Sequence, residues 1–189
     1  YTIDIINKEG KYNIVGIIDS IHDIGSDRFG YKIIGRQENI VEIIEKYNIK
    51  GGIISIGDNW ARYYVSSQIK QQLPNFNFVN AIHPTVIIGD NVKLGRGITM
   101  MAGCIINPKS KIEDFVFFAT GAQVDHDCNI GNFSSISAGS ITGGYVTLGD
   151  YSAITLGVTI CDRLTIGSNT VVGAGSLVLN DVPDNVLVY

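Results

Sequence analysis

The sequence has few cysteines, no basic run and no long hydrophobic stretch. Its three cysteines are an odd number without a CxxC pair, which argues against a disulfide framework and a zinc ribbon. With 14 basic and 18 acidic residues and no basic cluster, the chain is a poor partner for nucleic acid. No apolar stretch approaches the ~18–20 residues of a membrane span, and no secretory signal is visible. We therefore expect a cytoplasmic protein that binds neither nucleic acid nor a membrane.

Histidine is also scarce. The three histidines are His22, His83 and His126, and they stand in unrelated positions of the sequence. A catalytic zinc site of the three-histidine type needs its ligands to converge on one point. The sequence therefore predicts no metal centre.

A six-residue rhythm dominates the second half of the chain. An apolar residue recurs at every sixth position from Ile82 to Val178, and only Thr142 in this series is polar. A small or β-branched residue follows four positions later, as at Cys104 and Cys128. No α-helix keeps a period of six, so the pattern predicts a β-helix in which each hexapeptide is a short strand and a corner. Three hexapeptides close one coil, and residues 18 apart should stack.

Glycine often follows the repeated apolar residue, as at Gly89, Gly131 and Gly149. A tight corner can need a backbone conformation that a side chain would hinder. We expect these glycines to serve the corners, and we expect Cys104 and Cys128 to be core residues rather than reactive ones.

Residues 1–80 lack the six-residue period and have the patterns of alternating helices and strands. We expect helices at 1–8, 38–47 and 60–73 and strands at 12–18 and 53–56. This alternation favours a small parallel sheet of the Rossmann type. In such sheets ligands bind beyond the carboxyl ends of the strands, which is where Asp19 and Gly57 would lie. The sequence thus predicts two domains, an αβ domain over 1–80 and a β-helix over 81–189.

His126 lies two residues after the inward Val124, at a corner and outside the core register. An imidazole can take a proton from an amine or a hydroxyl near neutral pH. Asp125 and Asp127 flank it, and either carboxylate could orient the ring and stabilise its charged form. The spacing alone leaves a second possibility open, which is a solvated corner histidine without a function.

One coil after His126, the same corner carries Gly144, beside the single polar lapse at Thr142. A backbone N–H at this glycine could meet the developing oxyanion of a thioester. Removing such a donor costs other acyl-transfer enzymes roughly 3–4 kcal/mol. The alternative is an ordinary Gly-Gly turn.

The run Thr-Gly-Ala-Gln-Val-Asp-His-Asp-Cys-Asn-Ile-Gly from Thr120 to Gly131 follows an αβ region. In this it resembles the sialic acid O-acetyltransferase family, which includes bacterial N-acetyltransferases of nucleotide-linked 4-amino sugars in glycan biosynthesis. The resemblance covers nearly the whole chain. It implies the left-handed β-helix of hexapeptide acyltransferases, acetyl-CoA as co-substrate, and a homotrimer in which His126 of one subunit faces the coenzyme of its neighbour.

The resemblance also implies roles for individual residues. His126 matches the catalytic base, and Asp127 matches the acidic neighbour that raises its basicity. Acetyl-CoA contacts are expected from Ser135, Gly144, Leu156 and Ala174. Contacts with the nucleotide sugar are expected from Asp19, Ser20, Ile56 and Gly57. The sequence departs from the family at Ala119, where related sequences usually carry Asn, and at Ser135, where some carry histidine.

Together these features predict an acetyltransferase that acts on the amine of a nucleotide-linked 4-amino sugar. His126 is the expected general base, and the acetyl group is expected to pass directly to the acceptor without an acyl-enzyme. O-acetylation of a sialic acid or another sugar hydroxyl is the first alternative. A non-catalytic, sugar-binding β-helix trimer is the second.

Overall fold

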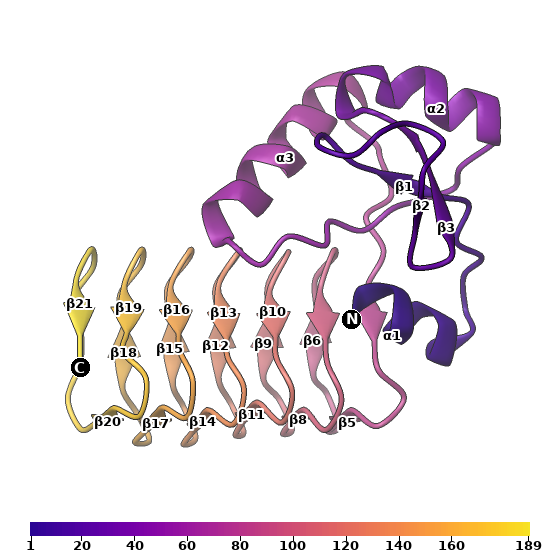
Figure 1. Cartoon of the computed structure of the whole chain (residues 1–189). Helices are drawn as coiled ribbons and strands as arrows, with labels where there is room; N and C mark the ends of the chain where they lie inside the picture. Colours follow the sequence, from indigo (N-terminus) through magenta and orange to yellow (C-terminus); the bar gives the residue numbers. More distant parts are fainter.

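The computed structural model describes residues 1–189. It has a helical N-terminal part and a long stack of short parallel strands (Figure 1). The helices are α1 (Thr2–Glu9), α2 (Ile40–Tyr47) and α3 (Asn59–Gln72), and a 3₁₀ turn, η1 (Gln37–Asn39), leads into α2. All three predicted helices are confirmed to within two residues at each end. None of the helices has the length and hydrophobicity that crossing a membrane would require.

The N-terminal sheet has three strands in the order β1-β3-β2: β1 (Ile17–Ile18), β2 (Asp27–Arg28) and β3 (Tyr31–Gly35). Of the strand predicted over 12–18, only Ile17–Ile18 forms, and it pairs in parallel with β3, which lies outside both predicted strands. β2 runs antiparallel to β3. Between β2 and β3, Phe29 and Gly30 both have a positive φ, at 55° and 82°. Two such residues in succession close a tight hairpin, which reverses the chain without a helical crossover.

The strand predicted over 53–56 does not form. Only the preceding residue, Gly52, makes a parallel bridge, and its partner is Phe78. Ile54 is nevertheless buried against α2 and α3. The run of apolar residues over 53–56 therefore predicted burial correctly, but it did not predict strand pairing.

The remaining strands are two residues long and wind into a left-handed β-helix with three faces. The first face contains β4 (Ala81–Ile82), β7 (Thr99–Met100), β10 (Phe117–Phe118), β13 (Ser135–Ile136), β16 (Ala153–Ile154), β19 (Val171–Val172) and β21 (Leu187–Val188). The second contains β5 (Ile87–Ile88), β8 (Ile105–Ile106), β11 (Gln123–Val124), β14 (Ile141–Thr142), β17 (Thr159–Ile160) and β20 (Leu177–Val178). The third contains β6 (Lys93–Leu94), β9 (Lys111–Ile112), β12 (Asn129–Ile130), β15 (Thr147–Leu148) and β18 (Thr165–Ile166).

The predicted stacking at intervals of 18 residues is confirmed by the strand register, in which Phe117 pairs with Ser135 and Ile130 with Leu148. The second residue of each strand points inward, and in the middle coils it is almost fully buried. Serines such as Ser110 also lie inside, where the Ser110 hydroxyl donates to the Asp125 carbonyl. Because no buried side-chain nitrogen or oxygen lacks a hydrogen-bond partner, these polar residues do not weaken the core.

Each corner of the β-helix repeats a residue with positive φ every 18 positions. The glycine corner, between the first and second faces, contains Gly103, Gly121, Gly139, Gly157 and Gly175. The histidine corner, between the second and third faces, contains Asn91, Lys109, Asp127, Tyr145 and Arg163. The aromatic corner, between the third and first faces, contains Gly97, Phe115, Phe133, Tyr151 and Asn169. Two corners thus hold larger residues in a conformation that usually favours glycine.

The glycines that follow the repeated apolar residue have a different purpose from the predicted one. Gly131 has no positive φ, but a Cβ there would lie 2.6 Å from Asp150 Oδ1 and 2.7 Å from the Asp150 backbone nitrogen. Gly121, by contrast, has a φ of 70° and open space around it. Glycine at Gly131 therefore permits adjacent coils to approach closely, whereas glycine at Gly121 permits the turn itself.

Helix α3 lies across the aromatic corner and joins the N-terminal part to the coils (Figure 1). Phe133 stacks between Phe115 and Tyr151, with ring centroids 4.8 and 5.6 Å apart. Trp60, on α3, stacks on Tyr151 at 4.4 Å. Stacked and edge-on aromatic pairs of this kind add to the free energy of burial. Helix α1 packs on β4 at the first coil.

Candidate active site

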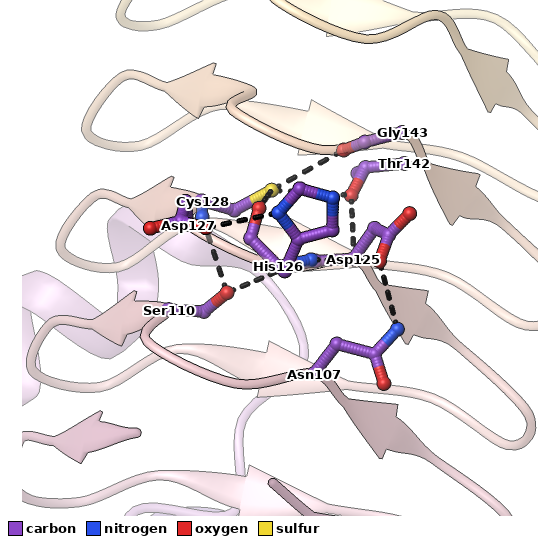
Figure 2. Close-up of polar contacts among 8 residues, drawn as sticks. All are labelled: Asn107, Ser110, Asp125, His126, Asp127, Cys128, Thr142 and Gly143. Atoms are coloured by element: carbon purple, nitrogen blue, oxygen red, sulfur yellow. Dashed lines mark hydrogen bonds and ion pairs between the residues drawn. The ribbon is translucent and has the colours of Figure 1, made fainter. Parts of the chain in front are cut away.

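His126 lies in the histidine corner just after β11, with its side chain 47% exposed. Its Nδ1 lies 2.9 Å from Asp127 Oδ2 (Figure 2). Asp127 is the residue of this corner with positive φ, at 55°. When Nδ1–H donates to the carboxylate, Nε2 is the ring nitrogen with a free lone pair. The pair thus has the orientation that a general base requires.

Asp125, the other flanking carboxylate, does not contact the ring. Its Oδ1 accepts the His126 backbone N–H at 2.8 Å and the Asn107 side-chain amide at 2.9 Å (Figure 2). Burial acts to raise the Asp125 pKa, but these two hydrogen bonds and the nearby imidazole outweigh it and lower the pKa. Of the two carboxylates that the sequence left open, only Asp127 orients the imidazole.

Thr142, the one polar residue in the inward series, is 2% exposed and lies beside this segment. Its Oγ1 accepts the Asp125 backbone N–H at 3.2 Å and lies 3.7 Å from Cys128 Sγ. The Cys128 thiol in turn donates to the Gly143 carbonyl at 3.3 Å, and burial raises the pKa of this thiol. Figure 2 shows these contacts around the imidazole. The lapse in the apolar rhythm thus supplies a buried acceptor for the segment that carries His126.

Gly144 lies next to the imidazole, as the spacing of 18 residues predicts. A Cβ on Gly144 would lie 2.8 Å from both Cε1 and Nε2 of His126. The Gly144 N–H makes no hydrogen bond within the chain, so it can donate to a bound group. The ring of Tyr145 meets the imidazole edge-on at 5.2 Å, and the Arg163 guanidinium lies 4.7 Å from the centre of the Tyr145 ring.

Two predicted coenzyme contacts, Leu156 and Ala174, lie in the glycine corner and not beside His126. They occupy adjacent coils, because the N–H of Gly175 donates to the Leu156 carbonyl at 2.8 Å. Leu156 is 60% exposed, and its N–H and that of Ala174 make no hydrogen bond within the chain. Ser135, the third, is nearly buried on the first face. Within one chain Leu156 and Ala174 thus lie at a different corner from His126, and Ser135 lies on the first face.

The Asp19 carboxylate, just after β1, organises its own loop. It accepts the backbone N–H groups of Ile21 at 2.7 Å and His22 at 3.0 Å, and His22 Nδ1 lies 3.0 Å away. These hydrogen bonds hold the Asp19 pKa well below its usual range, and the bond from the His22 backbone N–H has the largest effect. Asp19 is therefore a fixed negative charge, with Ser20 beside it.

Ile56 and Gly57 lie just before α3. Their carbonyls both accept from Arg62 Nη1 at 3.0 Å, while the Asp58 side chain caps the helix by accepting the Ala61 N–H at 2.7 Å. No hydrogen bond joins this segment to the loop of Asp19. No group of three or more His, Cys, Asp or Glu side chains in the structure could hold a metal ion.

Comparison with known proteins decides the family. Residues 2–69 match the PglD N-terminal domain family. The whole chain is similar to PerB, a perosamine N-acetyltransferase from Caulobacter crescentus whose structure contains CoA and GDP-perosamine. That match has 31% sequence identity, covers 100% of this chain and 87% of PerB, and has a TM-score of 0.90. This chain belongs to the hexapeptide-repeat sugar N-acetyltransferases.

The acetyltransferase is similar to two further solved structures. The acetyltransferase domain of PglB from Neisseria gonorrhoeae FA1090, in complex with acetyl coenzyme A, is 25% identical; the match covers 98% of this chain and 88% of that one, with a TM-score of 0.90. WeeI from Acinetobacter baumannii AYE, at 22% identity, covers 97% and 87% with a TM-score of 0.85 and shares the fold. The predicted family, fold and acyltransferase class are thereby confirmed. These relatives favour an enzyme over a non-catalytic sugar-binding protein.

Sequence reasoning missed two features of the acetyltransferase. Tyr145 contacts the imidazole, and the 18-residue spacing from Asp127 could have found it. Arg62 is 2% exposed, and no sequence signal separates it from a solvated residue on the polar face of a helix.

We predict that Thr142→Val lowers both stability and turnover. Valine keeps the shape but leaves the Asp125 N–H without its acceptor, which costs about 1–3 kcal/mol of unfolding free energy. The segment through His126 then shifts, and kcat falls about tenfold. Urea denaturation and steady-state kinetics measure the two effects.

Thr142→Ser keeps the hydroxyl and should retain most of the activity. Thr159→Val, at an exposed position on the next strand of the same face, is the matched control. Equal kinetics for Thr142→Val and Thr159→Val would show that the buried hydroxyl does not position the histidine.

Proposed function

We propose that this acetyltransferase moves the acetyl group of acetyl-CoA directly to the amine of a nucleotide-linked 4-amino sugar, with His126 as general base. The observation that carries the proposal is the 2.9 Å contact between His126 Nδ1 and Asp127 Oδ2, which leaves Nε2 free beside Gly144. The ligands bound to PerB, CoA and GDP-perosamine, and the acetyl coenzyme A bound to the PglB domain support the donor and the acceptor class.

Each residue of the corner has a step in this reaction. Acetyl-CoA supplies the activated acetyl group. His126 Nε2 removes a proton from the sugar amine as the nitrogen attacks the thioester carbon, so that a C–N bond forms and the C–S bond breaks. The Gly144 N–H donates to the carbonyl oxygen as negative charge develops there. Asp127 stabilises the imidazolium, which then returns its proton to the departing thiolate.

The glycine corner has the features that a bound coenzyme needs. The N–H groups of Leu156 and Ala174 are free to donate, and open space surrounds Gly157 and Gly175. Because this corner and His126 lie on different edges of the β-helix, we propose a homotrimer in which the coenzyme lies between His126 of one subunit and Ser135, Leu156 and Ala174 of its neighbour. We retain the cytoplasm as the proposed location.

We assign the acceptor to the N-terminal part, with residues 1–80 as the nucleotide-sugar-binding domain and 81–189 as the catalytic β-helix. Asp19 and Ser20 follow the carboxyl end of β1, where ligands bind in sheets with parallel strands. Ile56 and Gly57 stand at the start of α3. These four residues form the proposed nucleotide-sugar site.

A screen for thiol release tests the function. Acetyl-CoA is combined with GDP-perosamine and other nucleotide-linked amino sugars, with free amino sugars, and with sialic acids. Rapid thiol release with a nucleotide-linked amino sugar, and an N-acetylated product by mass spectrometry, is the expected result. Release with sialic acids alone would replace the proposal with O-acetylation. No acetyl-CoA binding by calorimetry would refute both.

A further inference from the structure

A single buried arginine joins the N-terminal part to the β-helix. Arg62 projects from the first turn of α3, is 2% exposed, and forms no ion pair with a carboxylate. Burial lowers its pKa to about 10, which keeps the guanidinium charged at neutral pH. Burying an unpaired cation is costly unless polar groups surround it. The acceptors that meet this charge therefore indicate what it does.

Almost all of those acceptors are backbone carbonyls. On the β-helix, Nε donates to the Phe115 carbonyl at 2.8 Å, and Nη2 donates to the carbonyls of Phe133 at 3.0 Å and Ser134 at 3.2 Å. On the N-terminal side, Nη1 donates to the carbonyls of Ile56 and Gly57, both at 3.0 Å. One side-chain acceptor completes the set, Asn59 Oδ1 at 2.8 Å. The guanidinium has five N–H donors, and these contacts occupy it fully.

The coil that Arg62 contacts is the one that carries the proposed base. Phe115 and Phe133 occupy equivalent positions in adjacent coils of the aromatic corner. The chain between them runs through β10, β11 and β12 and includes His126. A rigid, planar guanidinium thus holds both ends of this coil at fixed distances from the Ile56–Gly57 segment.

We propose that Arg62 is a positioning residue for the acceptor. It fixes the position of the Ile56–Gly57 segment along the β-helix relative to the coil of His126, so that a nucleotide sugar bound there places its amine next to the base. This inference rests on the proposed function, because it takes Ile56 and Gly57 as acceptor contacts. An apolar side chain could attach α3 to the coils equally well. A guanidinium, with donors that point in several directions, is needed to hold the Ile56–Gly57 segment and the β-helix coil in a fixed relative position.

Steady-state kinetics of Arg62→Lys with GDP-perosamine and acetyl-CoA test the proposal. Lysine keeps the charge, but its single ammonium cannot reach both segments in the same geometry. We expect the acceptor kcat/KM to fall by about 10²-fold, as for a displacement near 1 Å, while the KM for acetyl-CoA stays within about twofold. A merely structural residue would change both substrates together. Arg96→Lys, at an exposed position in the same corner, is the matched control.

Each outcome of these kinetic measurements either supports or overturns the positioning role of Arg62. An unchanged acceptor kcat/KM in Arg62→Lys, or an equal loss for both substrates, overturns the positioning role. If Arg62→Lys does not fold, Asn59→Leu gives the second test, since it removes the one side-chain hydrogen-bond acceptor of the guanidinium. This variant should lower kcat/KM for the nucleotide sugar and leave the KM for acetyl-CoA unchanged. An equal loss for both substrates, or no loss, overturns the proposal. A wild-type enzyme that uses no nucleotide-linked amino sugar refutes the proposed function, whereas active wild type with normal Arg62→Lys refutes the positioning role alone.

Discussion

Replacing His126 with alanine lowers kcat by a factor of about 10²–10⁴, the contribution of a well-placed general base. The reason is that the flanking carboxylates replace an imidazole poorly, because a carboxylate is a much weaker base near neutral pH. Asp125 is in addition engaged by Asn107 and a backbone N–H. Thiol release under saturating GDP-perosamine and acetyl-CoA measures the loss. Acetyl-CoA affinity by calorimetry should be nearly unchanged.

A matched pair of variants strengthens this test. Asp127→Asn keeps the ring contact but removes the charge, so it should lose less activity than His126→Ala. His83→Asn replaces a histidine of the first coil, whose Nδ1 contacts Thr85, and should leave kcat unaltered. Near-normal turnover in His126→Ala would sink the mechanism and point to an amine that reaches the site already deprotonated.

The six-residue period predicted the register of the β-helix because every coil must bury the same positions. From that register alone, Gly144 had to lie one coil beyond His126, and the structure confirms it. The choice between Asp125 and Asp127 depended on something else. It was decided by side-chain contacts: Asp125 is held by Asn107 and the His126 N–H, whereas Asp127 lies 2.9 Å from Nδ1, and the repeat does not encode which way a corner side chain turns.

The N-terminal part was less predictable for a related reason. The apolar residues of 53–56 indicated burial correctly, but the carbonyl of the last of them, Ile56, and that of the next residue, Gly57, accept hydrogen bonds from Arg62. Arg62 itself bonds to carbonyls 53 and 71 residues away along the chain. Backbone acceptors belong to every residue type, so such a contact leaves no trace in the sequence.

Replacing Gly144 with alanine should lower kcat by roughly 10²-fold with little loss of stability. The added Cβ would lie 2.8 Å from Nε2 and Cε1 of His126, so the imidazole must move, and the methyl group occupies the space in which the acceptor amine meets the base. The backbone at Gly144 does not have a positive φ, and the half-exposed ring can shift into solvent. Kinetics and thermal unfolding of the same preparation separate the two effects.

Gly149→Ala is the control for crowding between coils. Its Cβ would lie 2.5 Å from the Ser168 nitrogen, in the aromatic corner and away from the base, so it should cost about 1–3 kcal/mol of stability and leave kcat unaltered. Full activity in Gly144→Ala would show that neither the free N–H nor the close approach to the imidazole matters. Because one variant crowds the backbone and the other crowds the ring, a loss of kcat confined to Gly144→Ala assigns that loss to the base and its oxyanion donor.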